Sequence, residues 1–263
     1  MKIILNADDF GRSLTLNQAV NDSFKQGLIF SAGLIVTGKY LQNALEYINA
    51  GDYVENIHLH LNVSTTRVDG DSEDKPLTEA MRKESLYCTN GKFSPYKSLP
   101  QKFSDVRKWK VVYRELVAQY EKFKEITKGK ADYKHIDFHL WYNLTWPVSV
   151  ALYFLIKKYK IESVRLIGLH QMSSRKNRLL CWISKPMNVK SIPSANIDYY
   201  LSKRQMFSKY QIIELYCHPN YKDGMFLDDS PSYLKHDRQP MLKQVQMLKA
   251  TGNIEFLSWK EVY

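Results

Sequence analysis

The sequence predicts an α/β fold, a single distorted (β/α) barrel-like domain of about seven parallel strands over residues 1–263. Three observations favour this fold. Short apolar runs with strand character alternate with longer amphipathic runs along the chain. The length of 263 residues is close to the roughly 250 residues typical of such barrels. No internal repeat or linker divides the chain into two domains.

Seven runs have the apolar or alternating character of strands. They lie at residues 2–9, 28–36, 56–62, 133–140, 163–167, 211–217 and 254–257. The first run ends in Asp8 and Asp9, and the sixth ends where Pro219 follows His218. Enzymes built on parallel sheets keep their chemistry at the carboxyl ends of the strands, so these polar residues are candidates for a functional site.

Runs with helical spacing separate the expected strands. They lie at residues 17–26, 41–50, 104–128, 148–159, 200–209 and 240–250. Gly27, Gly51, Gly129 and Gly252 follow four of these runs, where glycine commonly ends a helix. The first strand, helix and strand form a βαβ unit, which calls for a parallel pair with a right-handed crossover.

Residues 63–103 interrupt this alternation. The segment is rich in Asp, Ser, Lys, Pro and Gly, with a few aromatic residues between them. A long insertion between core elements is usually a functional lid or a disordered segment. We therefore expect a loop-rich, partly helical, lid-like insertion over the site. Residues 168–196 are irregular and basic, and they predict no element.

Composition limits the classes of function. The net charge of +11 could attract nucleic acid, but the cations are spread along the chain without a nucleic-acid-binding motif, which indicates a solvated surface. No apolar run approaches the roughly 18 residues of a membrane span, and no signal peptide is evident, so we expect a cytoplasmic protein. Cys88, Cys181 and Cys217 are widely spaced and are interpreted as reduced structural thiols.

Histidines recur on single faces of two expected strands. His58 and His60 share one face of their strand, and His135, Asp137 and His139 share one face of theirs, because side chains two residues apart project to the same side. Histidine is costly to bury without a partner. At least one of the first pair is therefore expected to be a metal ligand or a catalytic group.

Five polar residues fall at or near the carboxyl ends of expected strands, namely Asp8, Asp9, His60, His139 and His218. One carboxylate with two imidazoles is a set that binds zinc, iron, nickel, cobalt or manganese and leaves positions open for water and substrate. A second carboxylate and a further histidine could then move protons, which completes the equipment of a hydrolase. The alternatives are that the two acids cap a helix that begins near Ser13, or that these residues only stabilise loops.

Two further features lie beside this set. Arg165 is a charged residue in an apolar run, and a buried arginine is usually paired with an acid. Trp141, Tyr142 and Trp146 follow the strand that carries His139. Such aromatic residues either stack on sugar rings or pack a loop, and packing is the commoner role.

The chain resembles the YdjC-like carbohydrate deacetylases, a family that includes the chitooligosaccharide deacetylases. The segments that carry the resemblance are Asn6–Gly11, His60–Asn62, His135–His139, Arg165, Cys217–Pro219 and Phe256–Trp259. The resemblance implies a distorted barrel related to polysaccharide deacetylases. It also implies a metal-dependent hydrolase that removes an N-acetyl group from an amino-sugar oligosaccharide.

The resemblance further implies a role for each matching residue. Asp9, His60 and His139 would bind a divalent metal, magnesium or zinc, with cobalt, nickel or manganese as further candidates. Asp8 would be the general base, His218 the acid that protonates the departing amine, and Arg165 a supporting residue. Residues expected to contact the sugar are Asn62, Trp141 and Tyr142. A homodimer stays open.

The third motif departs from the family pattern, because Phe138 precedes His139 and residues 140–143 lack the further histidines that commonly follow. This departure puts the substrate and the rate in question. His58, where the family usually has a small residue, is expected to pack near the site, and His135 to be a buried hydrogen-bonding residue. Two other classes stay open: a sugar-binding homologue without catalysis, and a metal-dependent phosphoesterase.

Overall fold

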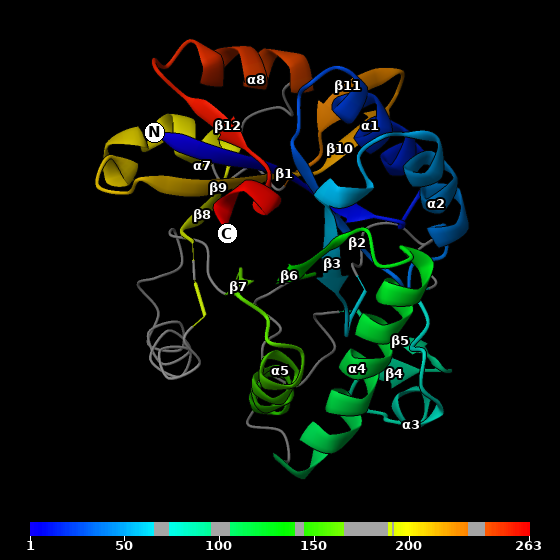
Figure 1. The fold of residues 1–263 in the computed structure, drawn as a ribbon. Coiled ribbons are helices and arrows are strands. Elements are labelled where there is room, and N and C mark those ends of the chain that lie inside the picture. Colours follow the sequence, from blue (N-terminus) through cyan, green and yellow to red (C-terminus); the bar gives the residue numbers. More distant parts are fainter. Residues whose placement is uncertain (66–73, 96–105, 140–144, 166–188, 191, 231–239) are drawn as a thin grey trace.

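A computed structural model of the protein describes residues 1–65, 74–95, 106–139, 145–165, 189–190, 192–230 and 240–263. Its centre is a parallel sheet that curls into a half-barrel, with helices packed along its outer side (Figure 1). The predicted fold class, a distorted (β/α) barrel, is therefore confirmed.

Within the described residues, eight parallel strands form the sheet. They are β1 (Lys2–Phe10), β2 (Ser31–Leu34), β3 (Ile57–Leu61), β6 (Asp132–Phe138), β7 (Ser163–Val164), β8 (Ser194–Asn196), β9 (Ile212–Cys217) and β12 (Glu255–Leu257). The order is β7-β6-β3-β2-β1-β9-β8, and β12 pairs with the first residues of β1. All seven predicted strands are present, whereas β8 lies in the segment that predicted no element.

The six predicted helices are also present; the helix at residues 41–50 has the predicted bounds, and the other five have shifted ends. They are α1 (Leu14–Lys25), α2 (Leu41–Ala50), α4 (Trp109–Ile126), α5 (Trp146–Tyr159), α7 (Ile197–Ser202) and α8 (Met241–Lys249). Ser13 caps α1, because its hydroxyl accepts a hydrogen bond from the Leu16 amide at 3.2 Å. The alternative that Asp8 or Asp9 caps this helix is therefore wrong. A short 3₁₀ turn, Arg204–Phe207, continues after α7 where a longer helix was expected.

Two hairpins were not predicted. In the insertion, β4 (Cys88–Thr89) pairs with β5 (Lys92–Phe93) after the short α3 (Glu79–Arg82). Past the sheet, β10 (Pro219–Lys222) pairs with β11 (Met225–Asp228). Both turns are two-residue, Asn90–Gly91 and Asp223–Gly224, with positive φ at every position, which is the conformation that Asn-Gly and Asp-Gly favour. These dipeptides were the signal that sequence reasoning did not use.

The two faces of the sheet differ in polarity. Leu5, Leu59 and Leu215 belong to the large apolar core, and comparable residues of β6 join them. Alternate residues of the same strands are polar and fully buried, among them His58 and Glu214. Side chains of a strand alternate between faces, so this pattern places one apolar face against the helices and one polar face inside the half-barrel. The polar interior is the candidate site.

The predictions about membrane spans and cysteines can be compared with the described residues. Within the ranges given above, no helix is long and apolar enough to cross a membrane. Cys88 and Cys217 are buried free thiols, as expected for structural cysteines, and Cys181 lies outside the described residues.

Candidate active site

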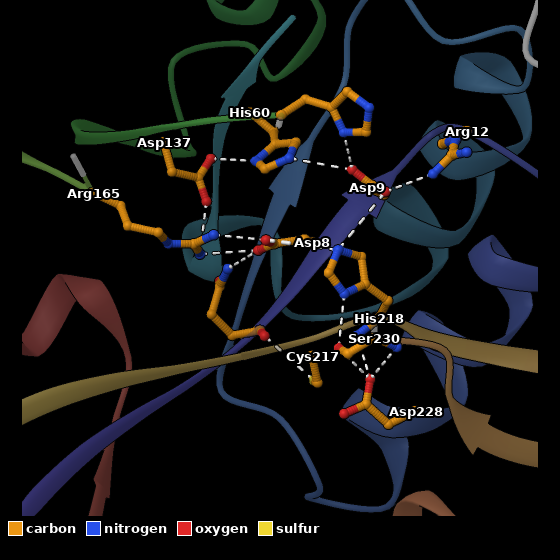
Figure 2. A network of polar contacts seen from close by, with 12 residues as sticks. Asp8, Asp9, Arg12, His60, Asp137, Arg165, Cys217, His218, Asp228 and Ser230 are labelled. Carbon is orange, nitrogen blue, oxygen red and sulfur yellow. Dashed lines mark hydrogen bonds and ion pairs between the residues drawn. The ribbon is translucent and has the colours of Figure 1, made fainter. Parts of the chain in front are cut away.

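Asp8 and Asp9 stand where β1 becomes irregular. The pairing of β1 with β2 shifts register between Ala7 and Phe10, and Asp9 has φ of +68°, in the left-handed region. On a regular strand two adjacent side chains point to opposite faces. The irregularity lets both acids turn toward the same centre, as Figure 2 shows. Backbone strain of this kind in a residue other than glycine concentrates at functional sites.

Asp9, His60 and His139 meet at one point inside the half-barrel. One oxygen of Asp9, Oδ1, lies 3.2 Å from His60 Nε2 and 2.6 Å from His139 Nδ1. The other oxygen, Oδ2, accepts a hydrogen bond from Arg12 at 2.8 Å. All three predicted ligands are at most 2 % exposed, and their donor atoms lie close enough to hold a metal ion. The tertiary structure thus brings together three residues from β1, β3 and the end of β6.

His60 is held on its other side by Asp137. Its Nδ1 lies 2.5 Å from Asp137 Oδ1, a contact drawn as a dashed line in Figure 2. Burial alone would lower the pKa of His60, but the carboxylates of Asp137, Asp9 and Asp8 raise it to about 10. Burial would likewise raise the pKa of Asp9, yet the nearby histidines and Arg12 hold it well below its usual range. The pocket therefore favours a positive charge beside these carboxylates.

This donor set fits a divalent metal. Carboxylates outnumber guanidinium groups in the contacts around it: Asp8, Asp9, Asp137 and Glu214 against Arg12 and Arg165. The Nε2 atom of His139 is buried without a hydrogen-bond partner. A carboxylate behind a ligating histidine, as Asp137 stands behind His60, is a recurrent arrangement at metal sites. Sequence reasoning placed Asp137 on the correct face but assigned it no role.

Asp8 is clamped by the predicted supporting arginine. Arg165 donates to both oxygens of Asp8, at 2.6 and 2.9 Å, and Asn6 donates to Asp8 Oδ1 at 2.8 Å. Three acids pair with this buried arginine. Besides Asp8, Asp137 Oδ2 lies 2.8 Å from Arg165, and Arg165 Nε donates to both oxygens of Glu214 at 2.8 Å. Glu214 was missed, although an acid inside the apolar run of residues 211–217 was an available signal.

His218 reaches the site from the end of β9. Its Nε2 lies 4.0 Å from Asp8 Oδ2 and 3.9 Å from Asp9 Oδ2, and its side chain is 22 % exposed. Behind it, Nδ1 lies 2.9 Å from the hydroxyl of Ser230, which donates to Asp228 Oδ1 at 2.6 Å. The β10–β11 hairpin returns the chain to bring Asp228 beside His218, which is why sequence reasoning missed this pair.

The histidines expected to play secondary roles do so. His58 Nε2 lies 3.1 Å from Asp137 Oδ2, and both residues are fully buried. His135 bonds to the hydroxyl of Ser163 at 2.8 Å and stacks on Trp259. Phe138 belongs to the apolar core, because it lies on the face of β6 opposite to Asp137. The departure at this position of the third motif is therefore directed away from the site.

Of the three residues expected to contact substrate, the structure describes only Asn62. Asn62 is fully buried, and its side chain donates to Asp74 at 3.0 Å and accepts from the Ser64 amide at 2.9 Å. In this structure it fastens the insertion to the end of β3, and a contact with substrate stays a prediction. Trp141 and Tyr142 lie outside the described residues, as do residues 140 and 143 of the altered motif.

We expect the buried carboxyl group of Asp74 to make the stability of the protein depend on pH. Burial raises the pKa of its carboxyl group to about 6, above the value of roughly 3.9 in an unfolded chain. The folded state therefore binds this proton more tightly, and the stability that the bound proton contributes is lost as the pH rises through about 6.

Asp74→Asn removes this titrating group. As the pH rises from 5 to 8, we expect the unfolding free energy of the variant to gain roughly 1 to 2 kcal/mol relative to that of wild type. Urea unfolding at both pH values measures this difference, and the exposed Asp52→Asn should show none. An equal pH dependence in Asp74→Asn and wild type would contradict it.

The chain is similar in sequence to known proteins. A family model described as "YdjC-like protein" matches residues 2–253. The chain is 27 % identical to carbohydrate deacetylase 2 of Listeria innocua, over 100 % of this chain and 99 % of that protein. It is 24 % identical to a carbohydrate deacetylase of Clostridium beijerinckii, over 100 % and 97 % of the two chains.

A solved structure shares the fold. It is a protein of Enterococcus faecalis V583 described as a candidate cellobiose-phosphate cleavage protein, with a TM-score of 0.65 and 19 % identity. The match covers 95 % of this chain and 91 % of that one. At this identity the likeness concerns the fold alone.

Proposed function

Because the chain belongs to the YdjC-like family, we propose that it is a metal-dependent carbohydrate deacetylase. The finer proposal is a hydrolase that removes the N-acetyl group from an amino-sugar oligosaccharide. One observation carries it: a set of donor atoms that could hold a metal ion, a clamped carboxylate and a partly exposed histidine meet at the carboxyl ends of parallel strands. The similarity to proteins named carbohydrate deacetylase supports the same reaction.

In this proposal Asp9, His60 and His139 hold the metal. When bound, a divalent ion polarises the acetyl carbonyl and lowers the pKa of a water molecule toward about 7. Two imidazoles with one carboxylate favour zinc, or cobalt, nickel or manganese, over magnesium, which prefers oxygen ligands.

Asp8 is proposed as the general base. Arg165 and Asn6 fix the direction of its carboxylate, and Asp8 directly precedes the proposed ligand Asp9 in the chain. A carboxylate held in this way can take a proton from the attacking water without reorienting. The same contacts explain why the acid remains in the interior, since a buried carboxylate without partners would be strongly disfavoured.

His218 is proposed as the general acid. Because the Ser230 hydroxyl donates to Asp228, its oxygen can only accept from His218, so the proton of that hydrogen bond lies on Nδ1. The opposite nitrogen, Nε2, faces Asp8 and Asp9 and can carry the proton that the departing amine nitrogen requires.

Ser230→Ala tests this arrangement. The substitution removes the acceptor that orients His218, and we expect kcat to fall about 10-fold, equivalent to one lost hydrogen bond of about 1–1.5 kcal/mol. Metal content should stay at the wild-type value, because Ser230 touches none of the proposed ligands. Steady-state acetate release and metal analysis of the same samples measure both. Unchanged kcat would exclude Ser230 from positioning His218.

The proposed function is tested by acetate release from a panel of N-acetylglucosamine oligosaccharides. The protein is stripped with chelator and reloaded with zinc, cobalt, nickel, manganese or magnesium, with Asp8→Asn as the inactive control. Release by wild type alone supports a deacetylase and ranks the metals. Hydrolysis of p-nitrophenyl phosphate without acetate release would favour the phosphoesterase, and sugar binding without either reaction would favour the non-catalytic homologue.

The remaining expectations from sequence are proposals of the same rank. They are a single domain over residues 1–263, a lid formed by 63–103, and a cytoplasmic protein that does not bind nucleic acid. The lid is supported by the position of the described part of the insertion, which lies beside the carboxyl end of β3. Thr65 and Asp74 both pair with the segment around Phe93, which ties the hairpin of the insertion to the carboxyl end of β3.

A further inference from the structure

The geometry points to Asp137 as a positioning residue shared by two parts of the site. On one side it orients the proposed metal ligand His60, and on the other it anchors Arg165, which holds the proposed base Asp8. The inference rests on the proposed function for the roles of His60 and Asp8. It goes beyond that function by assigning one carboxylate to metal binding and to the base together.

The contacts of Asp137 carry the inference. Its Oδ1 lies 2.5 Å from His60 Nδ1, and its Oδ2 lies 2.8 Å from Arg165 and 3.1 Å from His58 Nε2. The residue is fully buried. Figure 2 shows the resulting chain of contacts from His60 through Asp137 and Arg165 to Asp8. Both carboxylate oxygens are thus engaged, each on a different part of the site.

The contact with His60 decides which ring nitrogen is left for the metal. A carboxylate accepts but cannot donate, so Asp137 keeps a proton on His60 Nδ1. Nε2, which faces Asp9, is therefore the ring nitrogen that would give up its proton to bind a metal. Gly33 of β2 makes room for this pair: a Cβ there would lie 3.0 Å from the Cβ and Nδ1 of His60 and 3.2 Å from Asp137 Oδ1. The neighbouring strand therefore accommodates His60 and Asp137 as a unit.

The contact with Arg165 has a counterpart that serves as a control. Glu214 and Asp137 both accept from Arg165, and both are fully buried. Only Asp137 also contacts His60. Replacing either acid by its amide perturbs the arginine, whereas only the change at Asp137 removes a direct contact with the proposed metal ligand His60.

Asp137→Asn should turn its oxygen toward Arg165, because arginine cannot accept a hydrogen bond and histidine can. The amide nitrogen then donates to His60 Nδ1, which moves the His60 proton to Nε2 and blocks the atom that faces Asp9. We expect the affinity for zinc and for manganese to fall about 10- to 100-fold, the usual cost of losing a contact behind a metal ligand. Glu214→Gln should bind both metals as wild type does.

The experiment is calorimetric titration of zinc and of manganese into wild type, Asp137→Asn and Glu214→Gln, with thermal unfolding to verify that each is folded. Wild-type affinity in Asp137→Asn, or an equal loss in both variants, overturns the His60 part of the inference. Absence of metal binding by wild type overturns it as well. These titrations do not depend on a substrate, so a wild type that binds metal but releases no acetate faults the proposed function and leaves this part decided.

The Arg165 part is tested by a double-mutant cycle on kcat at saturating metal. Asp137→Ala should lower kcat in the wild-type background and have no further effect on kcat in Arg165→Ala, because both changes act through the same contact. In the Arg165→Ala background, Asp137→Ala should still weaken metal binding, because the contact of Asp137 with His60 does not involve Arg165. Fully additive losses in kcat would overturn a shared role.

Discussion

Asp8→Asn is expected to bind metal like the wild-type protein and to lose about 10²- to 10⁴-fold in kcat, the usual contribution of a positioned general base. The amide keeps the shape of the side chain but cannot take a proton from water. Asp8 contributes no atom to the cluster of Asp9, His60 and His139, so metal stoichiometry should not change. Acetate release under metal saturation, with metal content measured on the same sample, tests both halves.

The control for this variant is Asp52→Asn, the same chemical change at an exposed position remote from the site. It should match wild type in both measurements. Full activity in Asp8→Asn would remove Asp8 as the base. Loss of metal together with activity would instead indicate that Asp8 supports the metal site, since its partner Arg165 also contacts Asp137.

The second large effect is expected for His139→Ala, which should lose the metal itself. The change deletes one of three converging donors, and we expect the loss of affinity to exceed the roughly 10- to 100-fold that loss of an outer contact costs. Activity should fall with metal content, and excess zinc should restore little of either. Metal analysis after dialysis and calorimetric titration measure this directly.

His218→Ala is the matched control, because it deletes a histidine from the same site that is not among the donor atoms of the cluster. It should retain wild-type metal content and lose kcat. Equal metal content in His139→Ala and wild type would remove His139 from the proposed ligands, and metal loss in His218→Ala would add His218 to them.

Sequence reasoning succeeded where the informative pattern is local. The period of two in His58–His60 and in His135–His139 correctly placed these side chains on single faces, because strand geometry depends only on neighbouring residues. Their burial in a polar interior follows from the same pattern. Sequence patterns also located the seven predicted strands of the sheet, because their apolar runs differ from the polar segments around them.

It failed where the pattern is short or the contact is distant. The three residues of β8 are too few to show a period, and they become a strand only because β9 pairs with them. The hairpin of β10 and β11 was missed although Asp223–Gly224 marked its turn, and with it Asp228 and Ser230 behind His218. The hydrogen bond from Asn62 to Asp74 of the insertion was likewise not predicted, because it joins the end of β3 to a segment without a regular pattern.

The sequence by itself determined the alternation of strands and helices and the set of residues able to hold a metal, because these depend on residue type and spacing along one chain. Only the tertiary structure decided how that set is supported. The register between β3 and β6 places His60 opposite Asp137, and the irregularity in β1 turns Asp8 and Asp9 to one side. Arg165 connects Asp8 to Asp137. Asp8 and Arg165 are 157 positions apart in the chain, and no local pattern encodes such a contact.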